Sequence, residues 1–324
     1  MRQRSHRGNE AEFKIDRSSC HHAPPQFGVC VGGLLLLFFI IQCLPAQSNS
    51  VSKPNKLDAF SDYVLAYTNV VDSSLQRKIE AINERLREQF EMATNEPAVG
   101  LLDLRQLRLA MIHSDREEYA ASVAKIGILL AYFQLHPEAA TNLDTAARHD
   151  LGLMAKISSN EKAAQFSQEL GLKQIQQVLY RYHFYDTNHG GGIWVGKHYG
   201  KGSERIGSPV ANNSHAVTVR QLLRFFLMLE QGKLVSPQAS RTMREIFASP
   251  DLPHDDIKFV KGLAGRDVQI IRKWGTWETW YHDAAVITGP GRHYILAALT
   301  HHPKGDEYLV ALAREIDDLL SSDK

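Results

Sequence analysis

The stretch that most constrains the fold is an apolar run preceded by a serine and a lysine. It reads Glu118-Tyr-Ala-Ala-Ser122-Val-Ala-Lys125 and continues as Ile126-Gly-Ile-Leu-Leu-Ala-Tyr-Phe-Gln-Leu135. A helix that is apolar on every side must be buried rather than lie on the surface. The rest of the chain therefore has to fold around it. We expect Ser122 to be the N-cap or a first-turn residue of this helix.

Lys125 follows Ser122 by three positions, so the two side chains share a helix face and can form a hydrogen bond. Burial lowers the pKa of a lysine and favours its neutral, proton-accepting form. A serine beside such an amine is an activated nucleophile, and a helix N-terminus stabilises the negative charge that develops there. The alternative is an ordinary helix start whose lysine reaches solvent, because Ser-x-x-Lys also occurs by chance.

Two later segments extend this pattern. They are Lys156-Ile-Ser158-Ser159-Asn160 and Lys273-Trp274-Gly275-Thr276, the second followed by His282-Asp283-Ala-Ala-Val-Ile287 and Gly289-Pro-Gly-Arg292. In order and spacing, the three segments resemble the Ser-x-x-Lys, Ser-Asp-Asn and Lys-Thr-Gly signatures of active-site-serine penicillin-recognising enzymes. Over residues 70–322 the chain thus resembles the superfamily of class A β-lactamases and D,D-peptidases.

The resemblance implies acyl transfer through a covalent intermediate. Ser122 would attack a carbonyl carbon and Lys125 would accept its proton. Ser158 would relay that proton to the leaving nitrogen. Asn160 would hold a substrate amide and contact Lys125. Lys273, on a strand edge, would keep Lys125 neutral by its charge and orient a substrate carboxylate.

Backbone groups complete the implied site. The N–H groups of Ser122 and Thr276 would form an oxyanion hole, and Gly275 would let a backbone come close to the substrate. Each motif also has an ordinary structural explanation: the second can be a helix cap, and Lys273 can be a common edge-strand lysine.

The sequence departs from the family pattern in three places. Trp274 replaces a hydroxyl residue. The lost contact matters if its side chain faces the site, and matters little if the strand alternation turns it outward. Ser159 replaces an aspartate. No Glu-x-x-Leu-Asn motif follows Asn160, so a deacylation base is missing; Asp186 and Glu204 are candidates, although loop carboxylates are usually solvated.

The sequence therefore predicts an exported serine hydrolase that acts through an acyl-enzyme on Ser122. The implied substrates are β-lactams or related cell-wall peptide amides. The alternatives are a D,D-carboxypeptidase or penicillin-binding role with slow deacylation, and a non-catalytic cell-wall-binding module. No cofactor is implied. The histidines form no His-x-His-x-Asp or His-Glu-x-x-His motif, so no metal site is predicted. The preferred substrate and the oligomeric state stay open.

The expected fold is α+β, with an antiparallel sheet of roughly five strands built from both chain ends, flanked by helices, and an all-helical lobe. We expect one domain over 71–324, with a sheet lobe (71–113 and 255–324) and a helical lobe (114–254). The predicted strands are 98–103, 106–112, 259–263, 268–274, 284–288 and 294–300. The predicted helices are 72–90, 218–231, 237–247 and 306–320. Residues 137–183 are predicted to be helical throughout, and 189–202 are predicted to be a glycine-rich loop.

Residues 1–48 have the pattern of a signal peptide or an uncleaved signal anchor, with an apolar core within residues 27–44. Residues 49–70 are polar and are predicted to be a linker. Export to the periplasm or another extracytoplasmic compartment follows, with membrane attachment only if the segment stays uncleaved. The three cysteines all lie in the first 48 residues, and the formal net charge of +1 gives no indication of a nucleic-acid partner.

Overall fold

The computed structural model describes residues 56–200, 202 and 204–322. The helices are α1 (Lys56–Asp62), α2 (Ser73–Phe90), α3 (Lys125–Leu135), α4 (Thr145–Ala155), α5 (Asn160–Leu170), α6 (Leu172–Arg181), α7 (Val219–Glu230), α8 (Pro237–Ala248), α9 (Lys258–Gly262) and α10 (Gly305–Ser322), with 3-10 turns at Pro137–Ala140 and Thr187–His189. The strands are β1 (Ala98–Asp103), β2 (Arg108–Ile112), β3 (Glu118–Tyr119), β4 (Tyr185–Asp186), β5 (Gly191–Gly192), β6 (Trp194–Val195), β7 (His215–Val217), β8 (Gln269–Trp277), β9 (Trp280–Gly289) and β10 (Arg292–His301).

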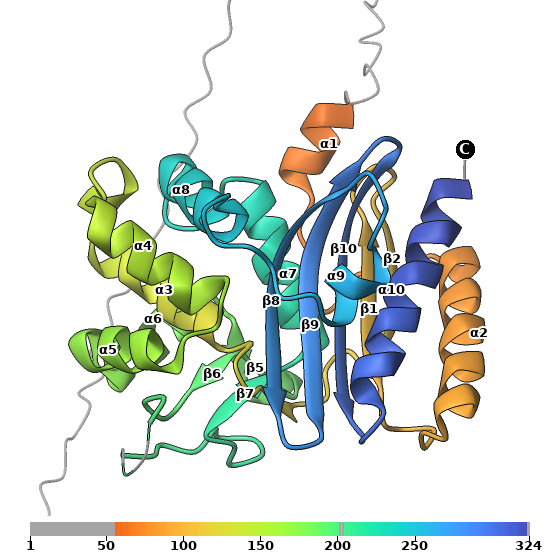
Figure 1. The fold of residues 1–324 in the computed structure, drawn as a ribbon, viewed down its shortest axis with the longest axis horizontal. Coiled ribbons are helices and arrows are strands. Elements are labelled where there is room, and N and C mark those ends of the chain that lie inside the picture. The colour runs from red at the N-terminus through yellow and green to blue at the C-terminus, as the bar shows by residue number, and fades with distance from the viewer. Residues whose placement is uncertain (1–55, 201, 203, 323–324) are drawn as a thin grey trace, which may run out of the picture. The chain divides into compact units, whose positions relative to one another are not determined.

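The main sheet has five strands in the order β2-β1-β10-β9-β8, and every neighbouring pair is antiparallel. Its first two strands come from the start of the domain and the other three from its end, so chain-terminal segments meet at the β1–β10 pairing (Figure 1). Short connections between β1 and β2, β8 and β9, and β9 and β10 fit antiparallel pairing. The α+β fold class and the origin of the sheet are confirmed.

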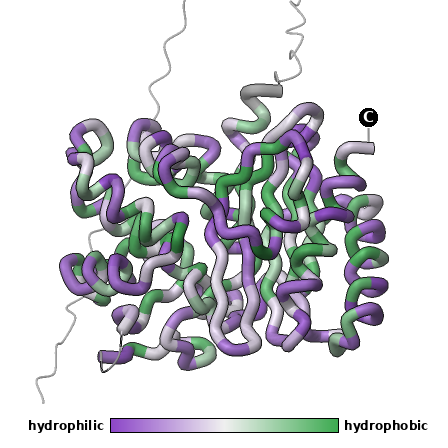
Figure 2. The backbone as a smooth tube through the Cα atoms, viewed as in Figure 1, coloured by the Kyte–Doolittle hydropathy of each residue, from purple (hydrophilic) through white to green (hydrophobic). Residues whose placement is uncertain are grey.

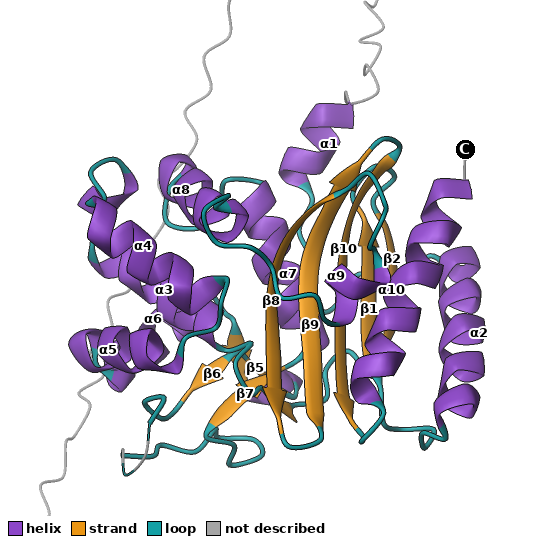
Figure 3. Ribbon diagram, viewed as in Figure 1, coloured by secondary structure: helices purple, strands orange, loops and turns teal. Residues whose placement is uncertain are grey.

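Helices cover both faces of this sheet. Helices α2 and α10 lie on one face, and α7 lies on the other, toward α3, α4, α5, α6 and α8 (Figures 1 and 3). The strand pleat divides the apolar residues accordingly: Val99 and Leu101 belong to the core beneath α2 and α10, whereas Ala98 and Leu102 face the larger core around α3 and α7. The central strands are therefore apolar on both faces.

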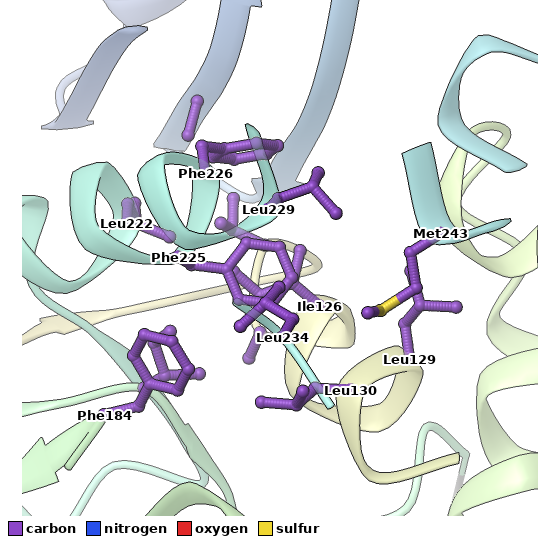
Figure 4. Packing of buried hydrophobic residues seen from close by; sticks show 14 of the residues in the cluster. Ile126, Leu129, Leu130, Phe184, Leu222, Phe225, Phe226, Leu229, Leu234 and Met243 are labelled. Carbon is purple, nitrogen blue, oxygen red and sulfur yellow. The ribbon is translucent and has the colours of Figure 1, made fainter. Parts of the chain in front are cut away.

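Helix α3 is the centre of the larger core. Ile126, Leu129 and Leu130 of α3 share this core with Phe225 of α7, and Leu129 lies beside Met243 of α8 (Figure 4). Helix α2, in contrast, is amphipathic. Its apolar side chains recur at helical spacing among polar ones, so green and purple segments follow one another along its tube in Figure 2. The predicted burial of the 126–135 run is confirmed, because nearly all of its apolar side chains are buried.

The predicted strand at 259–263 is wrong, because residues 258–262 form the helix α9. Phe259 and Leu263 are four positions apart, and both enter the core beneath α10. A Cβ built on Gly262 would lie 2.3 Å from the carbonyl oxygen of Val310, so this short helix packs closely against α10. A five-residue apolar run is too short for its periodicity to separate a helix from a strand.

From residue 56 onward, the segment predicted as a linker is packed against the domain. It contains α1, and Leu65 is buried in the larger core. The side-chain amide of Gln231 donates to the carbonyl oxygens of Phe60 and Tyr63, both at 2.7 Å. Isolated apolar residues in a polar segment thus anchor it to the domain. Residues 49–55 and the predicted export signal over 1–48 lie outside the described residues.

Two small sheets that the sequence does not predict lie within residues 114–254. One has the order β3-β7-β6 and the other pairs β4 with β5. Four of these five strands have only two residues, too few for alternation to identify them. None of the helices in the described part of the chain is long and apolar enough to cross a membrane.

We predict that Gly100→Ala destabilises the domain. A Cβ on Gly100 would lie 2.4 Å from Val219 Cγ1 and 2.8 Å from Leu223 Cδ1, where β1 packs against α7. Overpacking of this kind costs about 1–3 kcal/mol of unfolding free energy, measurable by urea denaturation. The control is Gly200→Ala, since a Cβ at that position meets nothing within 4 Å. An unchanged urea midpoint for Gly100→Ala would contradict the packing described.

Candidate active site

Ser122 lies in a tight turn that leads into α3. The Val123 N–H donates to the Ala120 carbonyl at 3.0 Å, and the Lys125 N–H donates to the Ser122 carbonyl at 3.3 Å. The helix itself begins at Lys125 and its N-cap is Ala124, so Ser122 does not cap it as expected. Ala121 has φ 48°, a left-handed conformation that is uncommon for a residue with a Cβ.

The Lys125 amine gathers the first two motifs around one atom. Its Nζ lies 3.0 Å from Ser122 Oγ, 2.6 Å from the Ser158 carbonyl oxygen, 3.2 Å from Ser158 Oγ and 2.7 Å from Asn160 Oδ1. Ser122, Ser158 and Asn160, which the sequence predicts as site residues, thus all contact the amine of Lys125. An amine in this position can take a proton from the Ser122 hydroxyl and pass it to Ser158.

Burial lowers the pKa of Lys125 to about 7. The side chain has no contact with solvent, and its four neighbouring acceptors are uncharged oxygens rather than a carboxylate. Desolvation disfavours the ammonium form, so near neutral pH a large fraction of the amine is unprotonated. The predicted lowering of the Lys125 pKa is therefore present. Its cause is burial, and not the positive charge of Lys273 to which it was first attributed.

The second motif, Ser158-Ser159-Asn160, both contacts Lys125 and caps a helix. Ser158 has φ 69°, and this left-handed turn points both its carbonyl and its hydroxyl at Lys125. Ser159 caps α5, because its hydroxyl accepts from the N–H of Lys162 at 3.2 Å. The serine that replaces the family's aspartate is therefore the helix cap, and the residues on either side of it contact Lys125.

Lys273 lies on β8, which is an edge strand as expected. It is fully buried, and its ammonium donates to the Trp274 carbonyl at 2.8 Å. Burial, together with the charge of Lys125, lowers the pKa of Lys273 well below its usual value. Its predicted contact with a substrate carboxylate stays a prediction.

At Gly275, strand β8 packs against the tight turn that carries Ser122, here called the nucleophile turn. A Cβ built on it would lie 2.9 Å from the Ser122 nitrogen and 3.0 Å from the Val123 nitrogen. The missing side chain therefore makes room for the turn itself, whereas the sequence analysis assigned that room to the substrate. Strand and turn are held together so closely that the N–H groups of Ser122 and Thr276 belong to one small region.

Trp274 and Thr276 alternate with Lys273 and Gly275 along β8. Their common contact is Lys258, which donates to Thr276 Oγ1 at 2.8 Å and lies 4.8 Å from the centre of the Trp274 ring. Lys258 is only 1% exposed and also approaches Asp306 at 3.5 Å. Trp274 thus packs over a buried lysine, and the Thr276 hydroxyl is bonded to that same lysine.

A cavity of about 460 Å³ opens beside Ser122. Its lining residues are Tyr119, Ala121, Ser122, Asn160, Lys197, His198, Tyr199, Gly200, Ser214, His215, Thr276 and Trp277. None of these described residues is an aspartate or a glutamate. The cavity combines a nucleophile, hydrogen-bond donors and aromatic walls, which suits a small polar ligand.

The two candidate deacylation bases lie elsewhere. Asp186 contacts His189 Nδ1 at 2.8 Å and accepts from the N–H of Asn188, and the bond to His189 lowers its pKa. Glu204 is exposed. Neither belongs to the described residues that line the cavity, so neither is placed to activate water at Ser122.

Tyr199 and His215 form a wall of the site that was not predicted from the sequence. The Tyr199 ring is 4.3 Å from that of His215 and 4.6 Å from Lys125 Nζ. His215 Nε2 donates to the Lys197 carbonyl at 2.9 Å, and burial lowers its pKa to about 4. Tyr199 lies within the predicted glycine-rich loop and His215 lies in a three-residue strand, and no motif marks either residue. In the described part of the chain, no group of three or more metal-binding side chains is present.

Comparison with known proteins identifies the family. A family model described as a beta-lactamase enzyme family matches residues 136–321, which is more than half of the chain. The chain belongs to the beta-lactamase enzyme family. The matched region of this beta-lactamase-family hydrolase contains Ser158, Asn160 and Lys273 and begins after Ser122 and Lys125. No curated protein matches its sequence.

Solved structures share the fold at low identity. A β-lactamase from Sphaerobacter thermophilus is 13% identical, with TM-score 0.61 over 77% of this chain and 98% of that chain. PBP-A is 17% identical, with TM-score 0.57 over 74% and 95%. A class A β-lactamase from Bacteroides cellulosilyticus is 13% identical, with TM-score 0.59 over 79% and 100%. The beta-lactamase fold of this family member is thereby established.

We predict that acylation of Ser122 follows the titration of Lys125. In the acyl transfer that the motifs predict, the neutral amine would be the base, so the acylation rate should rise about tenfold per pH unit below about 7 and level off above it. The measurement is the pH dependence of covalent labelling by a penicillin. Lys125→Met should remove both the rate and its inflection. An inflection near pH 10 would mean that the lysine has its ordinary pKa.

Proposed function

We propose that this protein is an exported active-site-serine hydrolase that forms an acyl-enzyme on Ser122. Its substrates are β-lactams or related cell-wall peptide amides. The observation that carries the proposal is the distance of 3.0 Å between the Ser122 hydroxyl and the buried amine of Lys125, whose pKa is about 7. A nucleophile and a base in contact, with the base partly neutral at working pH, are what acyl transfer needs.

The reaction follows from this geometry. Ser122 Oγ bonds to the substrate carbonyl carbon while its proton moves to Lys125 Nζ. The oxyanion is stabilised by the N–H groups of Ser122 and Thr276. When the amide C–N bond breaks, the proton passes from Lys125 through the Ser158 hydroxyl, 3.2 Å away, to the leaving nitrogen. An ester on Ser122 remains, and water hydrolyses it in a second step.

Slow release of a β-lactam acyl group fits the cavity better than fast turnover. No carboxylate is present among the described residues that line it, so no side chain of the usual kind activates the second water. One PBP-A variant was solved as an acyl-enzyme complex with penicillin G, and penicillin G is a suitable probe for this chain. We therefore favour a penicillin-binding, D,D-peptidase-like role over that of a fast β-lactamase.

We predict that penicillin G adds to the wild-type domain and that Ser122→Ala abolishes the adduct. Intact-mass spectrometry detects the adduct and its lifetime. The matched control is Ser73→Ala, an exposed serine at the start of α2, which should leave labelling unchanged. Turnover without a lasting adduct would instead indicate a β-lactamase. Neither adduct nor turnover would refute β-lactam recognition and leave the non-catalytic binding module.

We predict that Lys197 favours substrates with a negative group. It lines the cavity, and its charge contributes to the low pKa of His215. Losing a charge-assisted contact in Lys197→Met should raise KM for penicillin G about 10- to 100-fold and leave KM for its methyl ester nearly unchanged. Lys173→Met, on the exposed side of α6, is the charge-matched control. Equal losses for acid and ester would contradict this role.

Export is part of the proposal because residues 1–48 have the composition of a targeting segment. N-terminal sequencing of the protein recovered from the cell envelope would distinguish a cleaved signal from an anchor. Recovery of the full-length chain in the cytoplasmic fraction would contradict export.

A further inference from the structure

Tyr199 makes two contacts with the nucleophile region through different parts of its side chain. Its hydroxyl donates to the Ala121 carbonyl at 3.1 Å, and its ring lies over the Lys125 amine, 4.6 Å from ring centre to Nζ. Burial raises the pKa of the Tyr199 phenol well above its usual value, so the hydroxyl keeps its proton and remains a donor. None of the three sequence motifs includes this residue.

The hydroxyl contact acts on the peptide unit that joins Ala121 to Ser122. A peptide unit is planar and trans, so its C=O and its N–H point in opposite directions. A hydrogen bond that holds the Ala121 carbonyl therefore also sets the direction of the Ser122 N–H. That N–H is the oxyanion donor of the proposed reaction, and β8 approaches it at Gly275.

The turn needs such a restraint. Ala121 is held at φ 48°, and a residue with a Cβ stays in this region only when its surroundings impose it. Tyr199 is itself well fixed, since its ring packs 4.3 Å from that of His215, which in turn donates to the Lys197 carbonyl. The restraint is thus transmitted from β7 and the loop after β6 to the turn that carries Ser122.

The ring has a second effect, on the base. It covers Lys125 and keeps water from the amine, which favours the neutral form; the electron-rich ring face favours the charged form. Exclusion of water is the larger effect, because burial is the cause that brings the pKa of Lys125 to about 7. One residue therefore influences both the oxyanion donor and the base.

We propose that Tyr199 is a positioning residue: its hydroxyl aims the Ser122 N–H at the developing oxyanion, and its ring shields the Lys125 amine from water. The proposal rests on the proposed acyl-enzyme function. It separates the two parts of the side chain, and so it predicts different results for removing the hydroxyl alone and for removing the ring.

Tyr199→Phe removes the hydroxyl and keeps the ring. We expect its acylation rate with penicillin G to fall about tenfold, the usual effect of losing one aligned hydrogen bond, while the pH midpoint stays near that of the wild type. The control is Tyr180→Phe, which removes a phenol hydroxyl from a 43% exposed residue on α6. A Tyr199→Phe rate equal to that of the wild type would overturn the role of the hydroxyl.

Tyr199→Ala removes the ring as well. Water should then reach Lys125, and the midpoint of its titration should move upward by at least about one pH unit, toward the value of an exposed lysine. NMR titration of the Lys125 side chain in the free protein measures this without any reaction. A midpoint unchanged from that of the wild type would overturn the role of the ring. If Tyr199→Ala does not fold, Tyr199→Val, which also removes the ring and fills only part of its space, is titrated instead, and a midpoint that does not rise overturns the role of the ring.

The free-protein measurements keep this proposal distinct from the proposed function. If penicillin G does not label the wild type, acyl transfer to β-lactams fails. The Tyr199 proposal is then decided by the Lys125 titration and by hydrogen exchange at the Ser122 and Val123 amides. Exchange faster in Tyr199→Phe than in the wild type supports the restraint on the turn. Equal exchange in the two proteins overturns it.

Discussion

The structure depends on an amine that is held out of water without a carboxylate to balance it. Lys125 is surrounded by uncharged oxygens, from Ser122, Ser158 and Asn160, which can stabilise it in either protonation state. A carboxylate there would lock the ammonium form and remove its basicity. The acceptors come from the nucleophile turn and the start of α5, so the position of one nitrogen fixes the relation between these segments.

The sheet completes this arrangement from the other side. Strand β8 is an edge strand, and its backbone comes so close to the nucleophile turn at Gly275 that no side chain fits between them. Apolar cores on both faces of the sheet hold the strand rigidly. Helix α3 continues from the turn directly into the larger core. Ser122 therefore lies where the two parts of the domain meet, and both restrain it.

Much of the fold and part of the site could be predicted from the sequence. The long helices and strands have enough residues for their periodicity to be clear. Ser122, Lys125, Ser158 and Asn160 converge, as the resemblance to the family implies. Short elements could not be identified this way: α9 has five residues, and β6 has two.

The remaining site residues were hidden for a different reason. Tyr199 and His215 reach the cavity through tertiary packing, and neither has a fixed spacing from a motif that would reveal it. Gly275 was recognised as a point of close approach, but the sequence could not say that the neighbour would be the nucleophile turn. The absence of a lining carboxylate is likewise a property of the folded cavity rather than of any one segment.

The buried amine also links protonation to folding. In the folded protein Lys125 has a pKa of about 7, and in the unfolded chain it has the ordinary lysine pKa of 10.5. Between these values the unfolded chain binds more protons, so the contribution of this lysine to stability rises with pH. Below pH 7 it destabilises the folded state by about 5 kcal/mol, the full cost of burying an ammonium there. Loss of the same proton thus leaves the Lys125 amine free to accept another and relieves the domain of an unfavourable buried charge.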